Sequence, residues 1–339
     1  MPDARHPVSV RSLLVVILVV LAACGPGQDD AHVPPGARVI ELPGAADDID
    51  FDDIVYSPAL QRVLVPARES GLYLVEPDSG NATRVQHTGS VASADEGRGL
   101  LFLADPSERT ISVVDPRNGR TLSSASTSAA PDYVRYISTT GELWVTEPEA
   151  SPSGIEIFAL EEGTAPPGLR QVAFIPVPEG PEGFTSSETR QMAFTHAGSD
   201  LVAINVTSRT VTARWPTSCD GTHGFPPIDE RLGVVLASCA TDGAVSLLDL
   251  DGGRQLGRHE VGGGEALPAY SDRTGHFYVR ADPGTAIATL EPSEEGLALV
   301  RQVEVPEAGH CLTADDRGHY WTCDAANGRV LRFDDPDRC

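Results

Sequence analysis

Lysine is absent from this 339-residue chain, so all 25 of its Lys-or-Arg positions are arginine. Without a lysine amine, Schiff-base chemistry and a lysine general base are excluded. The sequence has no Cys-x-x-Cys pair, which rules out the common zinc-finger spacings and c-type haem attachment. It also has no Gly-x-Ser-x-Gly elbow and no phosphate-binding loop, the usual signals of a serine hydrolase and of a nucleotide-binding enzyme.

Positive charge is also scarce, because 49 acidic residues leave a formal net charge of −24. A surface with this much negative charge repels the phosphate backbone of nucleic acids, and we therefore expect no nucleic-acid partner. The simplest interpretation of the charge is solubility. A broad basic contact with anionic lipid headgroups is disfavoured for the same reason.

The first 23 residues have the three zones of a secretory signal. Arg5 and Arg11 precede an unbroken apolar run at 13–21 (LLVVILVVL), which is followed at once by Ala22 and Ala23. The apolar run is too short for a stable span, which takes about 20 residues. A positive start, a short apolar core and small residues before a cleavage site predict an export signal over 1–23.

The end of this segment, Leu21-Ala22-Ala23-Cys24, resembles the lipobox of bacterial lipoproteins. The resemblance implies cleavage before Cys24, lipid on its thiol and a membrane anchor at the cell envelope. Gly25 follows in place of the Asp that tends to retain lipoproteins at the inner membrane, which points to the outer membrane. The alternative is a plain secretory signal with an incidental cysteine. Residues 24–36 are rich in Gly, Pro and Asp and predict a flexible tether.

Five cysteines remain beyond Cys24, in what would be an oxidising compartment that favours disulfides. Cys219 and Cys239 flank one predicted hairpin, and Cys311 and Cys323 flank another. Each pair is therefore a candidate disulfide, with Cys339 as the odd thiol. The alternative is that Cys339 pairs with one of the four.

A repeated unit organises residues 37–339. In each copy an alternating apolar strand ends in an acidic residue and a turn with Pro, Asn, Ser or Gly, as in RTISVVDPRNG (109–119) and GAVSLLDLDGG (243–253). Two more strand candidates precede each copy, for example 222–228 and 233–239, and a fourth usually follows. Four strands recurring about every 40 residues predict seven blades of an all-β propeller. A longer third step predicts a surface insertion at 161–171.

The last unit ends soon after its third strand, whereas the strand-like segment 37–44 (ARVIELPG) precedes the first unit. We therefore expect 37–44 to supply the missing strand of the last blade. Such a splice closes the ring and leaves no free sheet edge at the seam.

The units resemble the YVTN-repeat propellers, also called YncE-like, most clearly at 132–146 (DYVRYISTTGELWVT) and 228–254. The resemblance covers nearly the whole of 37–339 and implies the fold. For activity it implies only a binding or surface role. The chain departs from the strict repeat, since its fourth unit is degenerate and no YVTN tetrapeptide occurs.

In a propeller the innermost strands line a central channel, and the residues at their starts form one face. The acidic, aromatic, basic and histidine residues at these positions are candidates to bind a polar ligand or a cation at a central funnel. They are Asp53, Asp132, Tyr133, Arg135, Glu182, Phe184, His223, Glu265 and His310. The competing interpretation is that these side chains only solvate the channel.

The sequence thus predicts a lipid-anchored, monomeric propeller that binds an unknown small molecule or protein and has no cofactor. The first alternative is a metal-dependent hydrolase or lyase that holds a divalent cation at the channel through its carboxylates and histidines. The second is a partner of a periplasmic redox enzyme. No catalytic residue is assigned.

Overall fold

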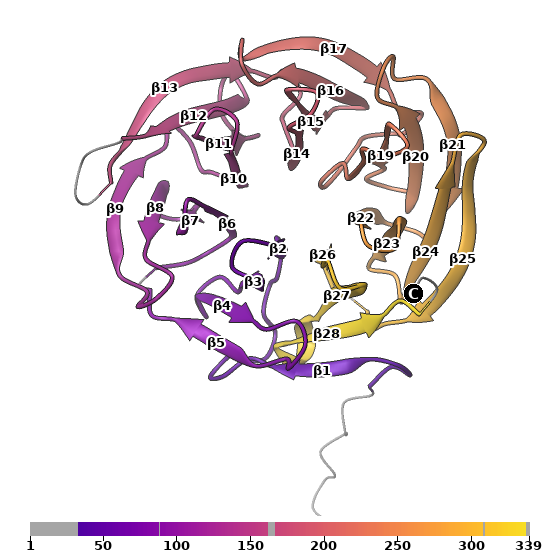
Figure 1. Cartoon of the computed structure of the whole chain (residues 1–339), viewed down its shortest axis with the longest axis horizontal. Helices are drawn as coiled ribbons and strands as arrows, with labels where there is room; N and C mark the ends of the chain where they lie inside the picture. The colour runs from indigo at the N-terminus through magenta and orange to yellow at the C-terminus, as the bar shows by residue number, and fades with distance from the viewer. Residues whose placement is uncertain (1–32, 88, 162–166, 308, 337–339) are drawn as a thin grey trace, which may run out of the picture. The chain divides into compact units, whose positions relative to one another are not determined.

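The computed structural model of the protein describes residues 33–336 except 88, 162–166 and 308. The described residues form seven four-stranded antiparallel sheets, arranged as blades around a centre (Figure 1). The predicted seven-bladed β-propeller is therefore confirmed. Over this part of the chain the single helical element is a 3₁₀ turn, η1 (Ala325–Asn327), and no helix is long and apolar enough to cross a bilayer. The predicted signal, Cys24 and Cys339 lie outside the described residues.

Each blade is numbered by its place in the chain. In blades 1 to 6 the strands run from the channel to the rim in sequence order. Blade 1 consists of β2 (Val55–Ser57), β3 (Arg62–Pro66), β4 (Leu72–Val75) and β5 (Ala82–Val85). Blade 2 consists of β6 (Ser93–Gly97), β7 (Leu100–Asp105), β8 (Thr110–Val114) and β9 (Thr121–Ser126). Blade 3 consists of β10 (Val134–Ile137), β11 (Glu142–Glu147), β12 (Gly154–Leu160) and β13 (Leu169–Pro176).

Blade 4 consists of β14 (Phe184–Ser187), β15 (Met192–Ala197), β16 (Asp200–Asn205) and β17 (Thr210–Pro216). Blade 5 consists of β18 (Ile228–Asp229), β19 (Val234–Ser238), β20 (Ala244–Asp249) and β21 (Gln255–Glu260). Blade 6 consists of β22 (Glu265–Ser271), β23 (His276–Asp282), β24 (Ala286–Ser293) and β25 (Gly296–Glu304). Blade 7 combines β26 (Leu312–Ala314), β27 (His319–Asp324) and β28 (Arg329–Asp334) with β1 (Arg38–Glu41).

The middle strands are apolar on both faces because each face packs on a neighbouring blade. In β7, Leu101 and Leu103 belong to a buried cluster shared with blade 1, whereas Phe102 and Ala104 belong to a cluster shared with blade 3. Similar clusters occur at every boundary between adjacent blades. The core of the protein is thus divided among seven interfaces around the ring.

The repeated acidic turn connects the third and fourth strands, as predicted. In blade 2 the backbone oxygen of Asp115 accepts a hydrogen bond of 2.8 Å from the Gly119 N–H, and its side chain accepts one from the Arg117 N–H at 3.0 Å. Gly119 has φ +69°, a conformation that glycine adopts without strain. The turn therefore needs both the acid and the glycine.

Ring closure follows the predicted splice. β1 pairs antiparallel with β28, with Arg38 opposite Arg332 and Ile40 opposite Val330. The indigo first strand accordingly lies along the yellow end of the chain in Figure 1. The Ile40 side chain is buried between blades 7 and 1 in a cluster that also contains Phe51 and Trp321. The first and last described strands thus share one sheet.

Two local predictions were wrong. The first strand of blade 5 is not 222–228, since β18 begins at Ile228 and Thr222 forms only an isolated bridge with Cys239. Pro226 and Pro227 cannot donate to a strand ladder, and Gly224 has φ +71°. The expected insertion at 161–171 was too long, because Leu169 already pairs with Leu160 in the sheet of blade 3.

Both predicted disulfides are present. Cys219 is bonded to Cys239 with their Cα atoms 5.1 Å apart, and Cys311 to Cys323 with theirs 5.8 Å apart. Each bond joins the loop before an innermost strand to the neighbouring second strand or its end. They therefore tie the start of blades 5 and 7 to the body of the sheet.

We predict that Ile40→Ala weakens the closure of the ring. The side chain is 2 % exposed, and truncating such a residue typically costs about 2–5 kcal/mol of unfolding free energy. Urea denaturation of the purified protein measures the loss. Leu299→Ala on the outer strand β25, where the side chain is 50 % exposed, is the matched control and should change stability by less than about 0.5 kcal/mol. Equal effects of the two substitutions would contradict a closing role for β1.

Candidate functional site

Side chains from the starts of the innermost strands, from the loops before them and from the end of β23 meet at one mouth of the central channel. Six acidic and histidine residues from several blades approach one another there and are called the mouth cluster. They are Asp52, Glu182, His223, Glu265, Asp282 and His310. Four of the six were candidates from the sequence. The closed ring brings them together although up to 258 positions separate Asp52 from His310 in the chain.

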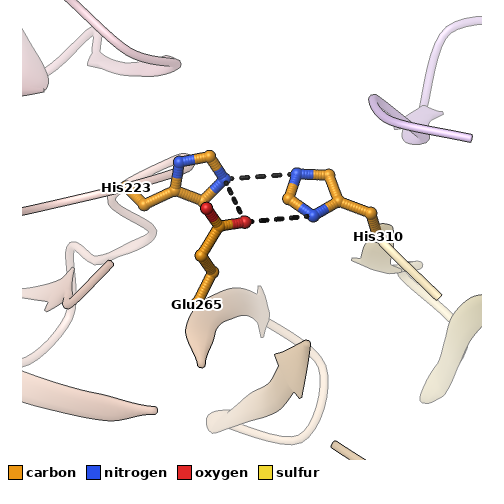
Figure 2. A group of neighbouring side chains, drawn as sticks. All are labelled: His223, Glu265 and His310. Atoms are coloured by element: carbon orange, nitrogen blue, oxygen red, sulfur yellow. Dashed lines mark hydrogen bonds and ion pairs between the residues drawn. The ribbon is translucent and has the colours of Figure 1, made fainter. Parts of the chain in front are cut away.

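The two histidines of the mouth cluster face each other across the channel mouth (Figure 2). The Nε2 atom of His223 is 3.2 Å from the Nε2 atom of His310, and the ring centroids are 5.1 Å apart. Glu265 lies beside both rings, with its Oε2 atom 3.6 Å from His223 Nε2 and 3.5 Å from His310 Nδ1. The three residues come from consecutive blades 5, 6 and 7.

Two further carboxylates contact the outer nitrogens of these rings. Asp282 Oδ2, at the end of β23, is 3.1 Å from His310 Nδ1, and Glu182 Oε2 is 3.5 Å from His223 Nδ1. A carboxylate at Nδ1 fixes the orientation of an imidazole and directs its Nε2 atom the other way. Each histidine is thus aimed inward by an acid behind it.

The backbone at His223 is held by buried groups of blades 4 and 5. His196 donates from Nδ1 to the Gly224 carbonyl at 2.8 Å, and its Nε2 atom accepts the Ser238 N–H at 3.2 Å. The Ser238 hydroxyl in turn donates to the His223 carbonyl at 2.5 Å. The Cys219–Cys239 disulfide anchors the same loop. His223 therefore projects from a rigid support.

A comparable support holds His310. The next residue, Cys311, is disulfide-bonded to Cys323 on β27. Gly309 lies directly against the buried Arg280 guanidinium, which a Cβ atom at this position would strike. Arg280 donates to the Pro306 carbonyl at 2.5 Å and to the Cys323 carbonyl at 3.1 Å. The loop that carries His310 is fixed on both sides.

The pKa values of the two histidines are shifted in opposite directions. Burial lowers the pKa of His223 to about 4, with a further contribution from the His310 charge, so His223 is neutral at pH 7. Burial acts in the same direction on His310, but the Asp282 hydrogen bond and nearby carboxylates outweigh it and raise the pKa. Burial and the charges of Asp52 and Glu265 raise the pKa of Glu182 to about 7. A neutral His223 ring has one unprotonated nitrogen, which can accept a hydrogen bond or bind a cation.

Next to the mouth cluster, two of the remaining polar candidates pair with each other and a third contacts the cluster. Arg135 makes a bidentate ion pair with the buried Asp53, with distances of 2.7 and 2.8 Å. The Tyr133 hydroxyl donates to Asp52 at 2.8 Å, and burial raises the pKa of this tyrosine well above its usual value. Burial and neighbouring carboxylates likewise raise the pKa of Asp132 well above its usual range. These contacts favour the interpretation that Asp53 and Arg135 stabilise the channel wall.

Phe184 and Phe225 lie in different environments beside the channel. Phe184 is 1 % exposed and packs against Trp144 between blades 3 and 4, so most of its surface belongs to the core. Phe225 lies under the Arg135 guanidinium, 4.3 Å from its ring centroid, and against the edge of Tyr133. A cavity of about 30 Å³ on its mouth side is also lined by His310 and Asp52.

On the other side of Phe225 the channel contains a larger pocket of about 330 Å³. Its walls come from the innermost strands of all seven blades. Polar groups from Asp95, Arg135, Thr185 and Thr313 alternate there with apolar side chains such as Ile54. Burial raises the pKa of Asp95 to about 6 against the opposing charge of Arg135. This lining can hold a small organic molecule with a few hydrogen-bonding groups.

Sequence reasoning missed Asp52, Asp282, His196 and Phe225. Asp52 adjoins a selected residue, and Asp282 is an acid at the end of a second strand, where no funnel position was expected. His196 lies within β15 and gives no periodic signal. Phe225 was assigned to a strand that is in fact a loop.

The fold defines the protein as a seven-bladed β-propeller, and solved structures of the same architecture are similar to it. A chain in "Crystal Structure of Mitotic Checkpoint Complex" has a TM-score of 0.72 at 14 % identity and covers 96 % of this chain and 99 % of its own. A chain of the Kuenenia stuttgartiensis hydrazine synthase has a TM-score of 0.70 at 12 % identity, covering 87 % and 99 %.

A third similar structure, U3-55K, has a TM-score of 0.70 at 11 % identity and covers 88 % of this chain and 98 % of its own. No protein-family model matches the sequence, and no curated protein sequence matches it. At identities this low the similarities establish the propeller fold alone. The resemblance to YVTN-repeat propellers therefore stays a prediction.

We predict that His196 makes stability depend on pH. Burial lowers its pKa to about 4 from an unfolded value near 6.5, so the neutral ring stabilises the folded state above pH 6.5. That contribution is lost as the pH falls from about 6.5 to 4, by up to about 3 kcal/mol. The difference in unfolding free energy between wild type and His196→Gln should shrink over this window. A pH-independent difference would show that His196 does not titrate as proposed.

Proposed function

We propose that this chain is an envelope lipoprotein, anchored through lipid on Cys24, whose propeller is a binding module for a small organic ligand. The observation that carries the binding role is the preformed pocket of about 330 Å³ in the central channel. Its volume lies at the lower end of known ligand pockets, which begin at about 300 Å³. The anchor rests on the lipobox resemblance at 21–24, and Gly25 in place of an Asp favours the outer membrane.

The pocket suits a compact ligand that carries both apolar and hydrogen-bonding groups. Thr185 and Ser186 on β14 and Thr313 on β26 supply hydroxyls, whereas Ile54 and Leu312 supply apolar surface. Asp95 supplies the acceptor, and its raised pKa allows it to carry a proton near pH 6. Rigid walls from seven blades limit the conformational cost of binding.

A protein partner is the other kind of ligand that a propeller binds. One of the similar folds is a chain within the Mitotic Checkpoint Complex, an assembly of proteins. The pocket in this chain favours a small molecule, or a short side-chain group of a partner, over a broad contact. The metal-dependent hydrolase or lyase expected as an alternative stays a prediction, because no described contact identifies a substrate. Membership of the YVTN-repeat group is part of this proposal.

We predict that filling the pocket abolishes ligand binding. Thr185→Trp places an indole on the pocket wall and should remove the saturation-transfer NMR signals of small aromatic and heterocyclic fragments that bind the wild-type protein. Thr83→Trp, on the exposed outer strand β5, adds the same side chain away from the channel and should leave these signals unchanged. Fragments that bind both variants equally, or a wild type that binds none, would overturn the channel as the binding site.

We predict that Cys24→Ser releases the protein from the membrane. Without the thiol there is no site for the lipid, so the chain should move from the detergent phase to the aqueous phase in a phase-partition assay of expressing cells. Lipid on one cysteine supplies most of the membrane affinity in this arrangement. Cys339→Ser is the matched control and should stay in the detergent phase. Retention of Cys24→Ser together with incorporation of labelled palmitate would contradict the anchor.

A further inference from the structure

The mouth cluster contains three donor groups at the spacing of metal ligands. One nitrogen from each of His223 and His310 and one oxygen from Glu265 all lie within 4.8 Å of one another. Two ligand atoms that each lie about 2.0–2.1 Å from a tetrahedral ion are about 3.3 Å apart. The 3.2 Å between the two Nε2 atoms and the 3.6 Å from Glu265 Oε2 to His223 Nε2 are close to that spacing.

The groups behind the histidines match the outer contacts of a metal site. A metal-binding imidazole usually gives its second N–H to a carboxylate, which fixes its tautomer and raises its basicity. Asp282 at 3.1 Å from His310 Nδ1 and Glu182 at 3.5 Å from His223 Nδ1 occupy those positions. The two Nε2 atoms face each other at 3.2 Å, as Figure 2 shows.

The supports of the two histidines make the arrangement rigid. His223 lies in the loop held by the Cys219–Cys239 disulfide and by Ser238, and His310 adjoins the Cys311–Cys323 disulfide. Histidines fixed in this way lose little side-chain freedom when they bind an ion. Glu265 is 41 % exposed, more than either histidine, so its side chain has room to adjust and complete the site.

Charge and donor type together select the ion. The cluster holds four carboxylates, and the positive charges beside it are those of Arg68, which pairs with Asp52 at 3.0 Å, and Arg280, whose charge helps to lower the pKa of Asp282. A divalent cation would offset this negative charge. Two imidazoles and one carboxylate favour zinc and neighbouring transition metals over Ca²⁺ and Mg²⁺, which prefer oxygen ligands.

We propose that His223, His310 and Glu265 bind one divalent transition-metal ion, with Zn²⁺ the best fit, at the mouth of the channel. Three protein ligands leave a fourth position for water or for a ligand group, the arrangement of an open rather than a structural site. Asp282 and Glu182 are positioning residues that orient the two imidazoles. The site lies on the mouth side of Phe225, outside the pocket of the proposed binding function, so either can fail without the other.

The test uses the mature chain, purified with a tag that contains no histidine and stripped with EDTA. Titration with Zn²⁺ in competition with a chromogenic chelator should show one tight site per chain. His223→Ala and His310→Ala should each weaken it by more than about 100-fold, and Asp282→Asn by about 10- to 100-fold through loss of the outer contact. His259→Ala, which removes a histidine from the rim strand β21, should not change the affinity.

Addition of Co²⁺ to the wild-type protein provides a measurement that needs no variant. A four-coordinate site should give the visible absorption bands of tetrahedral Co²⁺, and added Zn²⁺ should bleach them. Circular dichroism and melting of each variant separate loss of a ligand from loss of the fold. The absence of a tight site in the folded wild type, or equal affinity in folded His223→Ala, His310→Ala and His259→Ala, would overturn the proposal.

Discussion

The apolar contact between neighbouring blades is the interaction on which the rest of this structure depends. The middle strands carry buried side chains on both faces, so no blade can leave either face to solvent. A row of such sheets buries both faces of every blade only if it closes into a ring, and closure requires the pairing of β1 with β28. The closed ring then fixes the starts of seven inner strands around one channel. The approach of His223 to His310, from blades 5 and 7, follows from that closure.

This dependence explains why the fold was readable in the sequence. An alternating apolar strand recurs in each unit, in most of them followed by an acidic turn with glycine, and the segment 37–44 fits the one missing position. The exception is blade 5, where two prolines and Gly224 replace the expected strand by a loop. Blade 5 still has an innermost strand at this position of the repeat, the two-residue strand β18. Periodicity predicted the existence of each strand better than its start.

The site was only partly predictable, for a different physical reason. The period places Glu182, His223, Glu265 and His310 at one mouth, because each precedes or begins an innermost strand. It does not say which side chains pair across the channel, since that depends on rotamers and on what fills the centre. Asp53 and Arg135, selected for the same position in the repeat, bond to each other. Asp282, which orients His310, comes from the end of a second strand.

The polar residues of the channel thus fall into two groups with different consequences. The Asp53–Arg135 pair is complete: both carboxylate oxygens accept from the guanidinium, and removing either partner would leave a buried charge. In the mouth cluster Glu182 and Asp282 contact the Nδ1 atoms of the histidines, and the two Nε2 atoms face each other at 3.2 Å with Glu265 beside them. The same ring that positions the first group brings the second together without a bidentate ion pair of this kind. A propeller can therefore keep an acidic, histidine-containing mouth beside a fully paired wall, because the blades and not the polar contacts fix the positions of both.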